Sequence, residues 1–308
     1  MLLSSCVIWR YRSLEAFQEE CPGGDPRLQR VIVDQLDAAI AWLESLGAPV
    51  VEHDTGNPRT TGKRFDPAGL TQALVRVIGD SSVRLSERGQ TPLQKANILC
   101  TGGFPVRLAR ERGLLLRANP WSDGDGLDFA LARGGEIAGD LDEFYGRAMP
   151  ALQDLEEADF VRLAQLYGKH AIVTAHDMSE RFEGEPDWSE TRLVQQIAKW
   201  PDGLAWYTVH SSWLDLKIRD RTIREMIEAA RAAGGVVEEH DAKISVLVRP
   251  GVTQTLGGIR IDEHARVVGA EGLYAAGADV GGISNGGWSS GLAAALVFGR
   301  IAAEQALS

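Results

Sequence analysis

The sequence has 308 residues, of which 44% are hydrophobic and 24% charged, as in ordinary globular proteins. The formal net charge of −11 argues against a nucleic-acid-binding surface. No apolar run approaches the roughly 18 residues of a membrane span, and the apolar part of the N-terminus is too short for a secretory signal. The three cysteines, Cys6, Cys21 and Cys100, match neither a disulfide framework nor a zinc pattern. We expect a cytoplasmic protein of one large or two smaller domains, without a metal site.

The first third of the chain predicts two helices and a buried strand. Apolar residues at helical spacing predict a helix over 25–46, with Asp25 before a proline as its start signal. A second helix is expected over 70–78. Residues 81–92 are typical of an exposed hairpin or loop. The apolar run 96–100 predicts a buried strand that ends in a tight glycine turn.

The middle of the sequence predicts a different kind of domain. Residues 121–135 indicate a loop that enters a helix, capped by Ser122 or Asp123. From residue 151 to about 233, charged and aromatic residues increase, and the block holds four of the eight tryptophans. This composition favours an inserted substrate domain, and a helix over 221–235 is expected to lead out of it.

The last section predicts short strands followed by a helix. Residues 259–261 and 266–268 are expected to form two strands around a turn, and 273–276 a third, buried strand. After a dense group of glycines, a final helix is expected over about 291–305.

The glycine turns favour a ligand site. Each of these turns follows a strand or loop, and its glycines leave the backbone amides uncovered by side chains. The last turn also leads into a helix N-terminus. Such an end carries about half a positive charge and suits an anionic or electron-rich ligand. Tight packing of a helix on a sheet is the alternative, and it explains a single TGG turn equally well.

Four motifs together resemble a known family. They are "ILCTGGF", "SDGDGLDFALARGG", "TQTLGGIRIDEHARV" and "GLYAAGADVGGISNGGWSSGLAAALVFGRIAA". In this order they are similar to the flavoproteins of fumarate reductase and succinate dehydrogenase. The most similar branch contains the 3-ketosteroid dehydrogenases and tricarballylate dehydrogenase. The resemblance runs through most of the chain.

The resemblance implies FAD as cofactor. It places the TGG turn against the adenosine and pyrophosphate, and the acid that closes "YAAGAD" at the ribityl or pyrophosphate. It places the start of the last helix at the pyrimidine edge of the flavin ring, where a helix N-terminus would stabilise the charge of the reduced ring. The implied cofactor-binding residues are Thr101, Gly102, Gly103, Gly277, Asp279, Gly291, Leu292 and Ala293.

One part of the family pattern has no match. The family begins with a GxGxxG strand–helix unit of about 30 residues, and this sequence contains none. Three explanations are open: a truncated product, a second chain that supplies the unit, or a degraded homologue that no longer holds FAD.

The resemblance also implies hydride transfer between flavin N5 and a carbon–carbon bond, with a side chain that moves a proton. In the dicarboxylate reductases the donor is an arginine after an "RFxxE"-like motif. Here "RFEGEPDWSETR" supplies Arg181, Glu185 and Arg192. Because arginine rarely loses its proton, Arg192 needs an acid such as Glu185 as a relay. A surface salt bridge is the alternative. Tyr145 falls where relatives often place polar active-site residues.

Two departures argue against fumarate itself. Gln254 stands where the dicarboxylate branch has a histidine, and Gly287 and Trp288 stand where it has an arginine. A larger or less charged substrate fits better, with Trp288 either as a pocket wall or as a core residue.

These observations predict an α/β fold: a Rossmann-like flavin domain lacking its first βαβ unit, with an inserted α+β cap. The expected domains are 1–150 and 251–308 for flavin and 151–250 for the cap. The predicted function is an FAD-dependent dehydrogenase or reductase of CH–CH groups that takes a small-molecule substrate. An electron-transfer partner is a further expectation. The alternative is a non-catalytic remnant or subunit that does not hold FAD by itself.

Overall fold

The computed structural model describes residues 4–79 and 97–308, and its chain divides into two compact units. Unit 1 contains residues up to Gly103, Gly124–Leu141 and Leu256–Ser308. Unit 2 contains Phe104–Asp123 and Asp142–Thr255. The second unit therefore includes segments that the predicted boundary at residue 150 assigned to the flavin domain. The roles expected for the two domains stay predictions. The mixed α/β class is confirmed.

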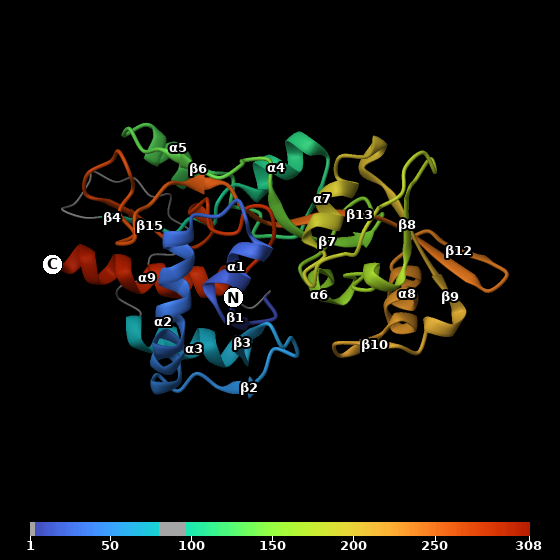
Figure 1. Ribbon diagram of the computed structural model, residues 1–308, viewed down its shortest axis with the longest axis horizontal. Coiled ribbons are helices and arrows are strands. Elements are labelled where there is room, and N and C mark those ends of the chain that lie inside the picture. Colours follow the sequence, from blue (N-terminus) through green and yellow to red (C-terminus); the bar gives the residue numbers. More distant parts are fainter. Residues whose placement is uncertain (1–3, 80–96) are drawn as a thin grey trace. The chain divides into compact units, whose positions relative to one another are not determined.

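Unit 1 combines small sheets with helices (Figure 1). Its helices are α1 (Leu14–Glu20), α2 (Pro26–Ser45), α3 (Pro67–Ile78), α5 (Asp125–Leu131) and α9 (Gly291–Leu307). Its strands are β1 (Val7–Tyr11), β2 (Val50–Glu52), β3 (Thr60–Phe65), β4 (Asn97–Leu99), β6 (Ile137–Ala138), β14 (Gly258–Ile259) and β15 (Leu273–Ala275). Strands β1, β3 and β2 form an antiparallel sheet, β14 pairs with β6, and β15 pairs with β4 in parallel.

Helix α2 confirms the prediction for residues 25–46. The Asp25 side chain accepts a hydrogen bond from the Arg27 amide at 2.9 Å, and Pro26 occupies the first turn, where it needs no amide partner. Leu28, Ile32, Leu36 and related residues are buried at helical spacing. Helix α9 lies beside α2 and contributes a second buried face (Figure 1). The predictions for 70–78 and 291–305 are confirmed by α3 and α9.

Unit 2 is built around one long strand. Strand β13 (Lys243–Thr255) pairs with β12 (Val237–His240), β9 (Ala205–His210), β7 (Phe144–Pro150) and β5 (Leu115–Leu116). Strand β8 (Ile172–Ala175) extends the sheet beyond β9, and β10 (Lys217–Ile218) pairs with β11 (Arg221–Thr222). The helices are α4 (Pro105–Arg112), α6 (Asp159–Arg162), α7 (Thr191–Ile197) and α8 (Ile223–Ala232). The helix predicted over 221–235 is α8. In unit 1, the buried strand predicted over 273–276 is confirmed by β15. The strand predicted over 96–100 forms as β4, but it is not buried, since Ile98 is 38% exposed.

Two local predictions were wrong. The N-cap of α5 is Gly124, at a φ of +97°, rather than Ser122 or Asp123. Asp123 instead forms an ion pair with Arg110 at 3.2 Å. Residues 259–261 and 266–268 do not form two paired strands. An isolated bridge between Ile261 and Val267 joins them, and Arg266 forms another with Tyr274. The strand that forms at the start of this region is β14, and it pairs with β6 instead of with the next segment of the chain.

The hairpin or loop expected over 81–92 lies outside the described residues. Within the part of the chain that is described, no helix is both long enough and apolar enough to cross a lipid bilayer.

Candidate functional site

The TGG turn and Asp279 bind each other in unit 1. The Asp279 carboxylate accepts hydrogen bonds from the Thr101 amide and from the Thr101 hydroxyl, the latter at 2.8 Å. It also accepts the amides of Gly102 and Gly103, at 3.3 and 3.2 Å. Asp279 is only 1% exposed. The carboxylate therefore occupies an anion-binding turn of its own chain and fastens the end of β4 to the residues that follow β15.

Gly126 belongs to the same cluster. Its amide donates to the Thr101 hydroxyl at 3.2 Å. A Cβ at this position would come within 2.8 Å of the Asp279 carboxylate, closer than real Cβ contacts. The glycine of the motif "SDGDGLDF" at position 126 is therefore required by packing, because the first turn of α5 lies directly against the TGG–Asp279 contact.

Most of the closing glycines hold the chain's own backbone. A side chain at Gly281 would overlap the backbone of Gly258 and Ala138, and one at Gly287 would overlap the Glu20 carbonyl. The Asp25 amide donates to the Gly282 carbonyl at 2.7 Å. For these glycines, close packing of backbone on backbone explains the missing side chains.

Gly277 and the start of α9 form a more open part of this region. Gly277 has a φ of +70°, and a Cβ there would meet only the Ala295 methyl, at 3.9 Å. Ser290 caps α9 and accepts the Ala293 amide at 3.3 Å. Gly291 and Leu292 are half-buried in its first turn, where amides have no partner within the helix. At Gly277 there is thus room beside the backbone that no side chain fills.

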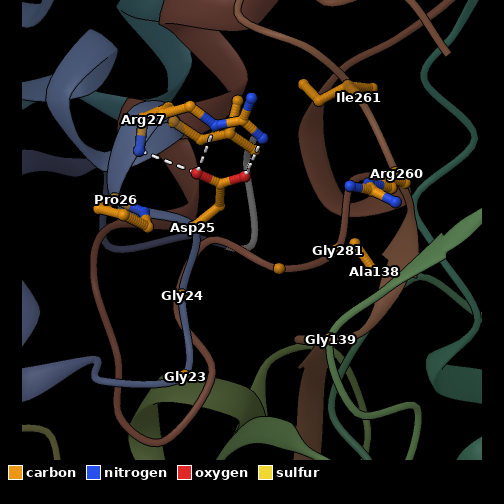
Figure 2. A pocket seen from close by; sticks show the side chains of 12 residues that line it. Gly23, Gly24, Asp25, Pro26, Arg27, Ala138, Gly139, Arg260, Ile261 and Gly281 are labelled. Carbon is orange, nitrogen blue, oxygen red and sulfur yellow. Dashed lines mark hydrogen bonds and ion pairs between the residues drawn. The ribbon is translucent and has the colours of Figure 1, made fainter. Parts of the chain in front are cut away.

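A pocket of about 420 Å³ lies at the start of α2 and is lined by Asp25, Arg27, Ala138, Arg260 and Gly281, among others (Figure 2). Its charges are matched within unit 1. Arg27 pairs with Asp25 at 2.8 Å and with Glu263 at 3.6 Å, and Arg260 pairs with Glu136 at 2.7 Å. These pairings give the pocket little attraction for an added anion.

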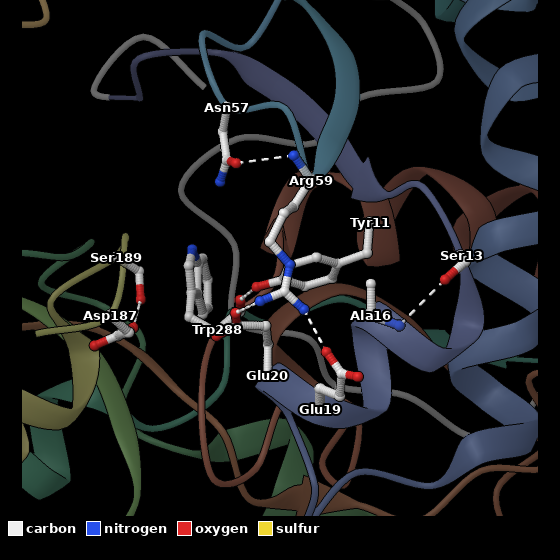
Figure 3. A network of polar contacts seen from close by, with 10 residues as sticks. All are labelled: Tyr11, Ser13, Ala16, Glu19, Glu20, Asn57, Arg59, Asp187, Ser189 and Trp288. Carbon is white, nitrogen blue, oxygen red and sulfur yellow. Dashed lines mark hydrogen bonds and ion pairs between the residues drawn. The ribbon is translucent and has the colours of Figure 1, made fainter. Parts of the chain in front are cut away.

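A polar network surrounds the backbone of Trp288 (Figure 3). The Tyr11 hydroxyl donates to the Trp288 carbonyl at 2.8 Å. Arg59 pairs with Glu19 at 2.6 Å and with Glu20 at 2.7 Å. The Trp288 side chain is 9% exposed. The Tyr11 hydrogen bond fixes the glycine-rich segment against β1, and the Arg59 ion pairs hold the residue before β3 against α1.

In unit 2, the structure brings two predicted residues together. Gln254 on β13 stands directly opposite Tyr145 on β7, next to an irregularity in the pairing after Val252. Both side chains are half-buried. Side chains directly opposite each other in an antiparallel pair are close enough to interact.

The three residues of the "RFEGEPDWSETR" segment are exposed. Arg181 forms an isolated bridge with Thr174, and Arg192 lies in the first turn of α7. The acid that binds the backbone there is Asp187, which accepts the Arg192 amide at 3.2 Å. The relay expected from Glu185 stays a prediction.

The sequence did not point to Asp187 or Glu190 as site residues. Arg147 donates to the Ser189 carbonyl. The Ser189 hydroxyl donates to the Asp187 carboxylate (Figure 3). Arg147 and Glu190 are each 5% exposed. Buried charged side chains are rare without partners. The available signal was the spacing of Glu190 two residues before Arg192, but an acid in a polar segment is usually a surface residue.

Burial and neighbouring charges shift the pKa values of Glu190 and Tyr145. Burial raises the pKa of Glu190 to about 7, although the positive charge of Arg147 opposes the rise. Burial also raises the pKa of Tyr145, but Arg147, Arg117 and Arg219 outweigh it, so this pKa lies below its ordinary value. An acid and a phenol with perturbed proton affinities are typical of functional sites.

A family model described as an FAD binding domain matches residues 69–291, well over half of the chain. The chain belongs to this FAD binding domain family. The predicted resemblance and the predicted FAD cofactor are confirmed. The function is thereby shown at the level of an FAD-binding oxidoreductase family related to fumarate reductases.

The relatives are distant. The fumarate reductase (cytochrome) of Shewanella frigidimarina is 23% identical over 379 aligned positions, which cover 94% of this chain and 65% of the relative. This family member thus spans somewhat less than two thirds of that protein's length.

Solved structures show the same fold. The open form of a flavocytochrome c3 fumarate reductase has a TM-score of 0.63 at 19% identity, covering 96% of this chain and 67% of that one. The 3-ketosteroid-Δ4-(5α)-dehydrogenase of Rhodococcus jostii RHA1, in complex with 4-androstene-3,17-dione, has a TM-score of 0.65 at 14% identity. It covers 100% of this chain and 89% of that one.

The described residues fit the flavin end of FAD. Open space at Gly277 and the first-turn amides of α9 offer the kind of surface that a flat ring with an electron-rich edge requires. The TGG amides are already bound by Asp279, so their contribution is to hold that carboxylate in place.

Proposed function

We propose that this FAD-binding protein is a dehydrogenase or reductase that transfers hydrogen across a carbon–carbon bond next to a carbonyl group. The substrate is a small molecule of low charge rather than fumarate. Gln254 and Trp288, which replace charged groups of the dicarboxylate branch, support this choice. An electron-transfer partner belongs to the same proposal.

The observation that carries the proposal is the environment of Tyr145. Its phenol has a lowered pKa because three arginines surround it, and Gln254 stands on the opposite strand. A phenol of raised acidity can give a proton to a carbon or polarise a carbonyl oxygen. Positive charge nearby stabilises the negative charge that develops on the substrate.

FAD, when bound, supplies the acceptance and donation of the hydride. In the proposal, Gly277, Gly291 and Leu292 lie against the flavin, and Asp279 orders the turn beside it through Thr101, Gly102 and Gly103. Ala293, whose amide is bound by Ser290, contributes helix geometry more than a direct contact. Tyr145 moves the second proton. Arg192, with Arg181 and Glu185 on the same segment, is the second candidate for that role.

The first test is the visible spectrum of the purified protein with and without added FAD. Retention of oxidised flavin after gel filtration supports the proposal. A colourless protein that takes up no FAD contradicts it and favours the non-catalytic alternative.

The second test is half-reaction kinetics under anaerobic conditions. We expect 4-androstene-3,17-dione to bleach the oxidised flavin, or an unsaturated ketone to reoxidise the reduced flavin. The rate of either step is expected to exceed the rate at which fumarate reoxidises the reduced flavin. Tyr145→Phe is expected to slow the step about 100-fold or more. Tyr274→Phe, a change of the same chemistry on β15 of unit 1, is the matched control. Equal rates in the two variants would exclude Tyr145.

A further inference from the structure

Glu190 occupies an unusual position at the entrance to α7. Its backbone is left-handed, with a φ of +57°, which is costly for a residue with a side chain. Its carboxyl is buried and accepts a backbone hydrogen bond from Gly168. Across the described residues, its Oε2 atom has no hydrogen-bond partner. Such a strained and incompletely bonded acid destabilises the fold, and this suggests a function.

Two tyrosines surround the same carboxyl. Tyr167 and Tyr207 are fully buried, and their rings meet edge to face at 5.7 Å. Their hydroxyls lack partners among residues 4–79 and 97–308. A Cβ at Gly168 would lie 3.0 Å from Glu190 Oε1 and 3.1 Å from the Tyr207 hydroxyl, so both atoms flank this glycine. The Glu190 carboxyl is therefore enclosed by buried polar side chains and has no access to solvent.

Arg147 connects the surroundings of the Glu190 carboxyl to Tyr145. Its guanidinium carbon lies 5.2 Å from the centre of the Tyr145 ring, and it donates to the carbonyl of Ser189, the residue before Glu190. Both Tyr145 and Glu190 attract its charge, and it is also hydrogen-bonded to Tyr145. The guanidinium thus interacts with the acid on one element and the phenol on another.

We propose that Glu190 controls the acidity of the Tyr145 phenol through the Arg147 guanidinium. The inference rests on the proposed function, since Tyr145 is the proton donor there. Glu190 is a positioning residue in this scheme, because it acts on Tyr145 only through Arg147.

The control follows from charge balance. When Glu190 is neutral, the positive charge of Arg147 acts fully on Tyr145 and favours its ionised form. When Glu190 is ionised, it cancels part of that charge and makes the phenol less acidic. Because burial holds the pKa of Glu190 near 7, the change falls in the neutral pH range.

Other charges face the two groups. Asp187 and Arg219 act on Glu190, and Arg117 and Arg219 act on Tyr145. Tyr167 and Tyr207 stay neutral because burial holds their pKa values above the ordinary range. Glu190 is thus the acid of this cluster whose pKa burial brings near neutral pH.

The test is NMR of the protein labelled with ¹³C at the tyrosine Cζ atom, without FAD or substrate. Tyr145→Phe assigns the Tyr145 signal. In the unmodified chain, this signal is expected to show a first step near pH 7, before the phenol itself ionises. A signal that stays flat until the phenol titrates would overturn the proposal, and this result requires no variant at position 190.

Glu190→Gln provides the second arm. It is expected to remove the step and to lower the pKa of Tyr145 by about one unit, because the compensating negative charge is gone. Glu183→Gln removes the same charge from an exposed site and is expected to change neither feature. An unchanged Tyr145 titration in a folded Glu190→Gln protein contradicts the coupling.

The two proposals fail separately. The NMR titration reports on the coupling even if the protein takes up no FAD. If it succeeds and turnover depends on Tyr145, the pH profile of the half-reaction is expected to lose its inflection near pH 7 in Glu190→Gln. If Tyr145 couples to Glu190 but Tyr145→Phe leaves the half-reaction unchanged, only the proposed function is wrong.

Discussion

At the scale of single residues, Glu190 links proton binding to stability. Its pKa is about 7 in the folded chain against an ordinary value of 4.5. Between these values the folded state binds a proton that the unfolded state has released. The contribution to stability is therefore present at low pH and is lost as the pH rises through about 7.

Glu190→Gln removes this dependence, because an amide does not titrate. Relative to the unmodified protein, the variant is expected to gain on the order of 3 kcal/mol as the pH rises from about 5 to about 8. Urea unfolding at several pH values measures the difference. A difference that stays constant with pH would show that the carboxyl is not buried in its charged form.

The closing glycines offer a matched pair of substitutions. Gly281→Ala places a methyl group inside the backbone of Gly258 and Ala138, whereas a Cβ at Gly299 of α9 meets nothing within 4 Å. We expect Gly281→Ala to lower the free energy of unfolding by about 2 kcal/mol or more. Gly299→Ala is expected to raise it by up to about 1 kcal/mol, because alanine is the better helix former. Thermal and urea unfolding of both variants test the pair; equal effects would contradict the close packing.

At the same scale, the sequence did not show the contacts of the unit 1 residues that it assigned to the cofactor. Thr101 and Asp279 were each expected at the cofactor, yet they bind each other across 178 positions. A contact of this range has no local pattern. Glu190 was missed for a related reason, since its burial depends on Gly168, Tyr207 and Arg147 from other elements.

At the scale of elements, helix ends show which local signals are reliable. Helix α8 begins with a capping box: the Thr222 hydroxyl accepts the Glu225 amide at 3.2 Å, and the Glu225 carboxylate accepts the Thr222 amide at 2.7 Å. Thr222→Ala is expected to cost about 1 kcal/mol, and Thr222→Ser to retain most of the stability. Urea midpoints of the two variants decide this; equal losses would mean that the hydroxyl does not cap the helix.

Long amphipathic helices were predictable because their periodicity is a local property. Helices α2 and α9 agree with the sequence to within a few residues. The strand expected over 259–261 was not predictable, because β14 depends on a partner more than 100 positions earlier in the chain. The cap of α5 was wrong because the ion pair between Asp123 and Arg110 competes with capping.

At the scale of the whole molecule, the chain passes between the two units more than once, and this affects how each can fold. Unit 2 consists of residues 104–123 and 142–255. Its first segment carries β5, which pairs in parallel with β13. Leu115 of β5 is buried in a core cluster with Met149, Leu163 and Ala164. Arg117 also donates to Thr253 at 2.6 Å. The segment 104–123 is thus part of the core of unit 2, although the sequence placed it with the flavin domain.

A fragment that contains only residues 142–255 is therefore expected to lack a cooperative unfolding transition, since it loses β5 and exposes the cluster around Met149. A chain running from 104 to 255, with 124–141 replaced by a Gly–Ser linker of the same length, retains both segments and is expected to unfold cooperatively. Loop entropy changes little because the linker length is kept. Near-UV circular dichroism during urea unfolding measures both fragments. Equal cooperativity in the two would mean that β5 contributes little to this core, and it would remove the physical reason for counting 104–123 as part of unit 2.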